Sequence, residues 1–166
     1  NVDSGAIDYL FAQKEAGAIG QLGFCSELSA DKLEAFIGRY PWDFVRLRIN
    51  FYDWFERGVR ERYEVAAAAG LPIIAHGALR TGPATRLKEE PLRILKEADP
   101  ARSSVDWALR FVKSLPEVRT VSCNVHSVSQ MQQNMEVFSD GEVLDSTALD
   151  ALRMAAEAQR AQKSSR

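Results

Sequence analysis

The stretch DFVRLRINF, residues 43–51, alternates apolar and charged side chains in the period-two pattern of a β-strand. Val45 and Leu47 fall on one face of such a strand, and Arg46 and Arg48 fall on the other. We expect the apolar face to pack against helices. Both guanidinium groups then lie on the inner side of the sheet.

The order of a strand followed by a helix occurs four times along the chain, which predicts a parallel sheet. The expected strands are IGQLGFC (19–25), DFVRLRINF (43–51), LPIIAHG (71–77) and RTVSCNV (119–125). The expected helices include 29–40, 54–70, 84–98 broken by Pro91, 103–115 and 127–138.

The ends of the chain add a helix on each side of these units. Residues 5–16 have helical spacing and Gly17 is a plausible stop. A last helix is predicted from about Thr147 to Gln162, followed by a tail that should fray. We therefore expect four strand-helix units in residues 1–146 and a terminal helix with its tail in 147–166.

Composition and charge exclude several classes of protein. The formal net charge is -2, and 21 basic residues are interspersed with 23 acidic ones, so the sequence predicts no nucleic-acid partner. No apolar run approaches the roughly 20 residues that cross a bilayer, which predicts no membrane association. Two cysteines are too few for a disulfide framework, in agreement with a cytoplasmic location.

Five segments, in order, resemble the second half of the eight-stranded barrel of aldo-keto reductases, in the bacterial branch of that family. They are KEAGAIGQLGF (14–24), YPWDFVRLRINFYDW (40–54), YEVAAAAGLPII (63–74), SSVDWALRFVKSLPEVRTV (103–121) and SQMQQNMEVFSD (129–140), and together they span nearly the whole chain. The resemblance implies an α/β half TIM barrel related to NAD(P)H-dependent carbonyl reductases, with NADP as cofactor.

The resemblance also implies which residues meet the cofactor. Gln130 and Asn134 match the helix that meets the adenosine end, and Asn50 is kept from the family's Gln-x-Gln-x-Asn motif. Cys25 takes the place of the family serine in Gly-Phe-Ser-x-His, and Arg80 falls at the family's phosphate-contacting loop. Departures from the family pattern cluster at the carboxyl ends of the strands, where such barrels keep their chemistry.

The family's proton-donating tyrosine and its partners belong to the other half of the barrel, so no catalytic residue is assigned to this chain. Two classes of function stay open. The chain is either one half of a nicotinamide-dependent carbonyl reductase, inactive alone, or a non-catalytic fragment or redesigned scaffold that self-assembles. Retention of Gln130 and Asn134 favours the first class, and loss of the family glutamine at Arg46 favours the second.

Arg46 and Arg48 need partners if they face a closed barrel interior, because an unpaired buried charge costs several kcal/mol. A bound phosphate or carboxylate could be that partner, since guanidinium groups match such anions. Glu27, Asp43 or a carboxylate of another chain could serve equally. We therefore treat Arg46 and Arg48 as a candidate anion site.

Cys25, His76, Cys123 and His126 are all the cysteines and histidines of the chain, and all fall at predicted strand ends. Two thiolates and two imidazoles could form a tetrahedral zinc site. The alternative is that the cysteines are small buried residues and the histidines rim side chains.

Two further patterns are given structural interpretations. Ser26 and Glu27 beside Cys25 lack a base at a diagnostic spacing, so we expect helix-capping or loop roles and no nucleophilic catalysis. The stripes Trp107 with Phe111 and Met131 with Met135 are predicted to be core faces packed on the sheet.

Four parallel strands cannot close into a barrel of this type, which needs about eight. Both sheet edges then have to be covered by another polypeptide. We expect either a homodimer that rebuilds an eight-stranded barrel or the missing N-terminal half-barrel. An open sheet of the flavodoxin kind, with helices on both faces, is the alternative.

Overall fold

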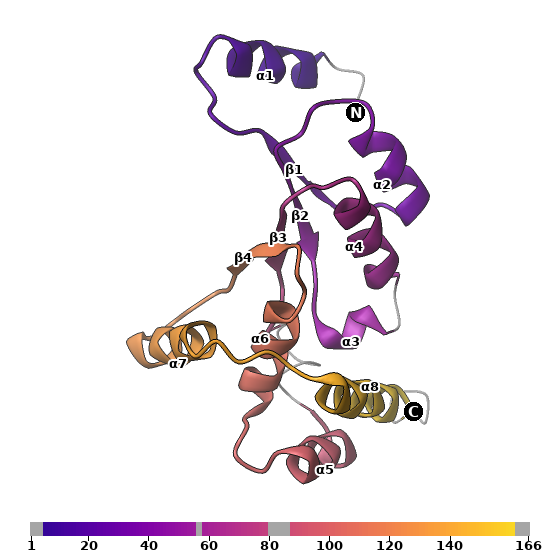
Figure 1. The fold of residues 1–166 in the computed structure, drawn as a ribbon, viewed down its shortest axis with the longest axis vertical. Coiled ribbons are helices and arrows are strands. Elements are labelled where there is room, and N and C mark those ends of the chain that lie inside the picture. Colours follow the sequence, from indigo (N-terminus) through magenta and orange to yellow (C-terminus); the bar gives the residue numbers. More distant parts are fainter. Residues whose placement is uncertain (1–4, 56–57, 80–86, 162–166) are drawn as a thin grey trace.

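The computed structural model describes residues 5–55, 58–79 and 87–161, and four parallel strands in sequential order form its single sheet. The strands are β1 (Gly23–Ser26), β2 (Phe44–Arg48), β3 (Ile73–His76) and β4 (Val118–Ser122). Strands that lie side by side in their chain order are typical of a barrel wound in one direction. In this sheet β1 and β4 are the two edge strands (Figure 1). The flavodoxin alternative would require the strand order to reverse, so it is excluded.

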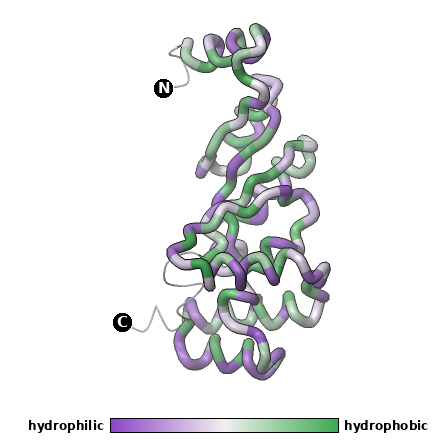
Figure 2. The backbone as a smooth tube through the Cα atoms, turned by 90° about the vertical axis from the view of Figure 1, so that its left-hand side faces the viewer, coloured by the Kyte–Doolittle hydropathy of each residue, from purple (hydrophilic) through white to green (hydrophobic). Residues whose placement is uncertain are grey.

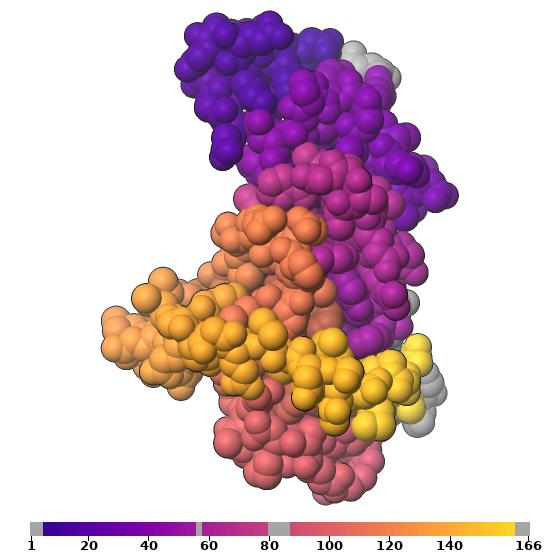
Figure 3. All heavy atoms as spheres, viewed as in Figure 1, coloured from indigo at the N-terminus to yellow at the C-terminus, as the bar shows by residue number. Residues whose placement is uncertain are grey.

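Helices separate the strands as predicted. Those that alternate with the strands along the chain are α1 (Ala6–Glu15), α2 (Ala30–Ile37), α4 (Val59–Ala68), α6 (Ser104–Lys113) and α7 (Val128–Ser139). Three more, α3 (Phe51–Trp54), α5 (Glu89–Ala98) and α8 (Ser146–Ala161), pack together below the sheet in the view of Figure 1. The molecule is elongated, with α1 at one end and α5 at the other (Figure 3).

Burial alternates along the two central strands and confirms the predicted faces. Val45 and Leu47 of β2 are buried on the side of α4, and in β3 Ile73 and Ala75 are buried. The intervening side chains, among them Arg46, project to the opposite, inner side of the sheet. Along the helices, hydrophobic and hydrophilic residues alternate (Figure 2), as expected for helices with one buried side.

Two predicted helices differ in detail from the structure. The segment 54–70 is not one helix, because α3 ends at Trp54 and α4 starts after Gly58, whose φ of +62° suits glycine. Pro91 does not break α5. It is the third residue of that helix, in the first turn, where its missing N–H group would have no intrahelical partner.

The prediction of core faces is confirmed for α6 and wrong for α7. Trp107 and Phe111 are buried, whereas Met131 and Met135 are exposed, together with Val128 and Phe138 of the same stripe. The reason is the position of α7 beyond the last strand, β4, which has no further strand beside it (Figure 1).

The N-terminal helix α1 is fixed to the rest of the molecule by aromatic and ionic contacts. The ring of Phe11 stacks on Tyr40 with centroids 5.3 Å apart and meets Trp42 edge-on at 5.1 Å. The ammonium group of Lys14 lies 2.6 Å from the Asp43 carboxylate. Over the described residues, none of the helices combines the length and hydrophobicity that spanning a bilayer requires.

Candidate functional site

A pocket of about 500 Å³ lies at the carboxyl ends of β3 and β4, beside the start of α7. It brings together five residues singled out in the sequence: Arg46, His76, His126, Gln130 and Asn134. The remaining lining residues are Gly77, Ala78, Leu79, Val105, Ser122, Asn124 and Gln133. Arg80, the candidate phosphate contact, lies outside the described residues.

The start of α7 presents polar groups to this pocket. The Ser127 hydroxyl caps the helix by accepting a hydrogen bond from the Gln130 N–H at 3.2 Å. The Gln130 side-chain oxygen accepts from the backbone N–H of His126 at 2.9 Å, one residue before the cap. This leaves the Gln130 side-chain NH₂ group to donate to a ligand.

Asn134 is the most informative residue of the pocket. Its side chain is only 8% exposed, and it makes no side-chain hydrogen bond within the part of the chain that is described. Its amide atoms still reach solvent, because Nε1 of Trp107 is the one fully buried side-chain polar atom without a partner among the described residues. Asn134 therefore fits a position that hydrogen-bonds a ligand in the pocket.

Asn50 has a local structural role. Its side-chain oxygen accepts from the Asp53 N–H at 2.9 Å and caps α3, while its NH₂ group donates to the Asp53 carboxylate at 2.9 Å. It is fully buried and is not among the residues that line the pocket.

The two arginines of β2 differ in their partners. The Arg48 guanidinium lies 3.6 Å from the Glu27 carboxylate, one of the expected pairs. Asp43 is instead taken by Lys14, whose hydrogen bond, together with one from the Leu22 N–H, lowers the pKa of that carboxyl. Arg46 has no ion pair among the described residues, and it needs none, because the inner face of an open sheet leaves it exposed to water.

Cys25 and His76 meet on the inner face of the sheet, with the thiol sulfur 3.9 Å from the imidazole Nε2. Burial, and then the positive charges of Arg46 and Arg48, lower the pKa of His76, so the ring is neutral at pH 7. The sequence groups Cys25 and His76 only within the candidate zinc set, because β1 and β3 are not adjacent and the pair is brought together by the strand registers through β2. Helical spacing could have revealed Gln133, which lies on the same side of α7 as Gln130 and Asn134.

The predicted zinc site is not assembled. No three potential ligands gather around one point among the residues with described positions. Cys123 lines a separate apolar pocket with Met131 and Met135, whereas its neighbours Ser122 and Asn124 face the strand-end pocket. The alternation of extended backbone thus turns Cys123 away from His76, and its burial raises the pKa of its thiol.

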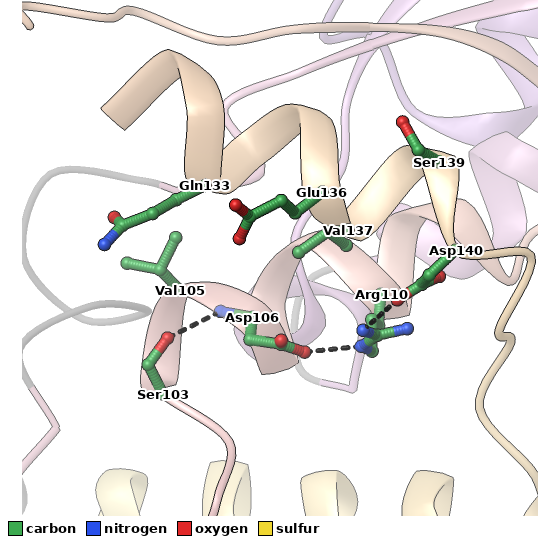
Figure 4. Close-up of a pocket in the computed structure, with 9 residues that line it drawn as sticks. All are labelled: Ser103, Val105, Asp106, Arg110, Gln133, Glu136, Val137, Ser139 and Asp140. Carbon is green, nitrogen blue, oxygen red and sulfur yellow. Dashed lines mark hydrogen bonds and ion pairs between the residues drawn. The ribbon is translucent and has the colours of Figure 1, made fainter. Parts of the chain in front are cut away.

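A second groove, of about 530 Å³, runs between α6 and α7 (Figure 4). Its one cation, Arg110, is bound to Asp106 at 2.5 Å and to Asp140, and both ion pairs are drawn in Figure 4. Gln133 and Glu136 project from α7 toward α6 above them. Because Arg110, Asp106 and Asp140 are paired with each other, we interpret the groove as the structural seam between two helices.

Comparison with solved structures places this fold among aldo-keto reductases. The holo form of aldo-keto reductase AKR11C1 from Bacillus halodurans superimposes with a TM-score of 0.68 at 18% identity, over 89% of this chain and 54% of that one. The thermostable aldo-keto reductase Tm1743, in complex with the inhibitor epalrestat, gives 0.69 at 18% identity, over 88% and 52%. No family model and no curated protein sequence matches the chain.

The chain therefore has the fold of half an aldo-keto-reductase barrel, and it spans about half the length of the solved structures it matches. The sequence interpretation of a half TIM barrel is confirmed.

Proposed function

We propose that the chain supplies the cofactor side of a cytoplasmic, NADP-dependent carbonyl reductase barrel and does not catalyse reduction alone. The observation that carries this proposal is Asn134, a largely buried residue at the carboxyl ends of the strands, whose solvent-accessible amide lines the pocket and has no side-chain partner among the described residues. Gln130 supports it with a free donor group at the same pocket.

Catalysis would need an acid of the family's kind, and the described lining of the pocket offers only the imidazoles of His76 and His126. Reduction of a carbonyl requires a hydride donor next to the carbon and an acid within hydrogen-bond reach of the oxygen. The described residues lining the pocket include no tyrosine, lysine or carboxylic acid. We therefore expect the acid to come from the polypeptide that completes the barrel.

The number of helices supports a complementary half-barrel as partner, in the same polypeptide or another. A closed barrel has one flanking helix for each strand, whereas here five helices, α1, α2, α4, α6 and α7, alternate with four strands along the chain. Two copies would bring ten such helices to eight strands. A partner that begins and ends with a strand, and has three helices between its four strands, would match this chain.

The cofactor proposal is tested by titrating NADPH into the chain and following the fluorescence of the nicotinamide ring. We expect weak, saturable binding that Asn134→Ala reduces about three- to tenfold, because each hydrogen bond contributes about 1 kcal/mol. Gln132→Ala is the matched control, since Gln132 is an exposed residue of the same helix outside the pocket. Equal affinities of the two variants would overturn the proposal.

Arg46 supports a second candidate, a non-catalytic scaffold that binds an anion at its strand ends. Arg46 lies in the pocket at the position of the family glutamine and has no ion pair within the described part of the chain. Binding of inorganic phosphate that persists in Asn134→Ala and is lost in Arg46→Gln would favour this candidate. A homodimer would be the corresponding assembly.

A further inference from the structure

We propose that Cys25, His76, Arg46 and Arg48 form a nucleophilic thiol site that takes a small anionic electrophile. The ligand class is a carboxylate attached to an electrophilic carbon. The charge selectivity of this site rests on the anion binding proposed above, whereas the reactivity of the thiol does not.

The strand registers place the four side chains in two adjacent rows on the inner face of the sheet. Cys25 pairs with Arg46 across β1 and β2, and Arg48 pairs with His76 across β2 and β3. Neighbouring strands lie about 4.8 Å apart, so each arginine stands beside its partner in the register. The thiol itself is exposed and therefore accessible.

His76 supplies the base. Its Nε2 lies 3.9 Å from the thiol sulfur, close enough to take the thiol proton when the sulfur attacks. A ring that is neutral at pH 7 has a nitrogen free to accept that proton. Sequence spacing alone indicates no such base for Cys25.

The arginines supply the charge selectivity. Glu27 offsets the charge of Arg48 at 3.6 Å, which leaves Arg46 as the cation without an ion pair among the described residues. Arg46 and His76 both line the strand-end pocket, and the partnerless Asn134 amide lines it as well. An anion held by Arg46 can therefore have its reactive carbon beside Cys25 and its remainder in the pocket.

The reaction of this site with iodoacetate follows from these positions. The sulfur forms a bond to the methylene carbon, the carbon-iodine bond breaks, and iodide leaves with the electron pair. The thiol proton passes to His76 Nε2. The carboxylate of the reagent stays bound to Arg46 throughout.

Cys123 provides an internal reference in the same molecule. It lies between β4 and α7, away from the arginines, and no histidine bond is found for it among the described residues. After trypsin digestion the two cysteines occur in different peptides, residues 15–32 and 120–153, so both rates come from one sample.

The test compares the alkylation rates of both cysteines with iodoacetate and with neutral iodoacetamide, by peptide mass spectrometry of the full chain. We expect the ratio of the iodoacetate rate to the iodoacetamide rate to be at least about tenfold higher at Cys25 than at Cys123. Equal ratios at the two cysteines would overturn the proposed selectivity.

Variants separate the roles of the side chains. Arg46→Gln should bring the ratio at Cys25 to within about threefold of that at Cys123, whereas Arg60→Gln, at an exposed arginine of α4, should leave it unchanged. His76→Gln should slow both reagents at Cys25 equally, and unchanged rates would exclude the imidazole as base. An unchanged Cys123 rate shows that each variant is folded.

Discussion

Gly23 shows how closely two strands approach at a single residue. It is paired with Phe44 at the start of β1 and β2. A Cβ atom on Gly23 would lie 2.5 Å from the Phe44 carbonyl oxygen and 2.4 Å from a carbon of its ring. The backbone oxygen cannot move away without loosening the strand pair, so only glycine fits this position.

We predict that Gly23→Ala lowers the free energy of unfolding by about 1 to 3 kcal/mol, because the added methyl overpacks the strand pair. Urea denaturation followed by circular dichroism measures this change. Gly20→Ala is the control, since a Cβ at Gly20 meets nothing within 4 Å. Equal stabilities of the two variants would contradict the register of β1 on β2.

The roles of some residues could be predicted from their immediate sequence neighbours, and the roles of others could not. Ser103 and Ser127 cap their helices as their sequence positions indicate, with hydroxyl oxygens that accept from the Asp106 and Gln130 N–H groups. The resemblance assigns Asn50 to the cofactor. In the structure its side-chain oxygen caps α3 by accepting from the Asp53 N–H. The proximity of Cys25 to His76 depends on two strand registers, which no local pattern encodes.

At the scale of elements, charged side chains of α6 join it to the end of α7. Arg110 binds Asp106 within its own helix and Asp140 directly after α7. Lys113 donates to the Val137 carbonyl at 2.6 Å and to Asp140 at 2.8 Å. The guanidinium of Arg110, followed by Lys113, keeps the pKa of Asp140 well below its usual value.

This arrangement predicts a pH dependence of stability. A carboxyl whose pKa is lowered by folding stabilises the native state above its unfolded pKa of 3.8, and this stabilisation is lost as the pH falls from about 5 toward the lower folded pKa. The difference in urea midpoint between the unsubstituted chain and Asp140→Asn should therefore shrink from pH 6 to pH 3. Asp31→Asn serves as the control at an exposed position, and a difference independent of pH would contradict the ion pair.

The buried face of a helix could be predicted where the residues that it packs against are near to it in sequence. The amphipathic pattern predicted α6 with its buried face, because that face lies on the strands adjacent in sequence. The same pattern in α7 predicted a buried stripe, and Met131 and Met135 are exposed. Hydrophobic spacing identifies which side of a helix seeks a partner, and it does not reveal whether the partner is part of the chain.

At the scale of the whole molecule, the fold is half of a closed architecture. The half-barrel itself could be predicted, because the sequence contains four strand-helix units and five motifs in the order of the family. No further strand pairs with β1 or β4 among the described residues, so a partner for these two edges could not be predicted from them. The exposed stripe of α7, next to the edge strand β4, marks one of these open borders.

The central claim, that this border is open in the single chain, is tested most directly by the rates at which dilute hydrogen peroxide oxidises the three methionines. Met131 and Met135 are 49% and 56% exposed beside β4, and Met154, in α8, is 47% exposed and serves as the internal reference. At a concentration where the chain has the mass of a monomer, we predict similar oxidation rates for all three. Protection of Met131 and Met135 by tenfold or more relative to Met154 would show that the chain covers its own border, and would contradict the account.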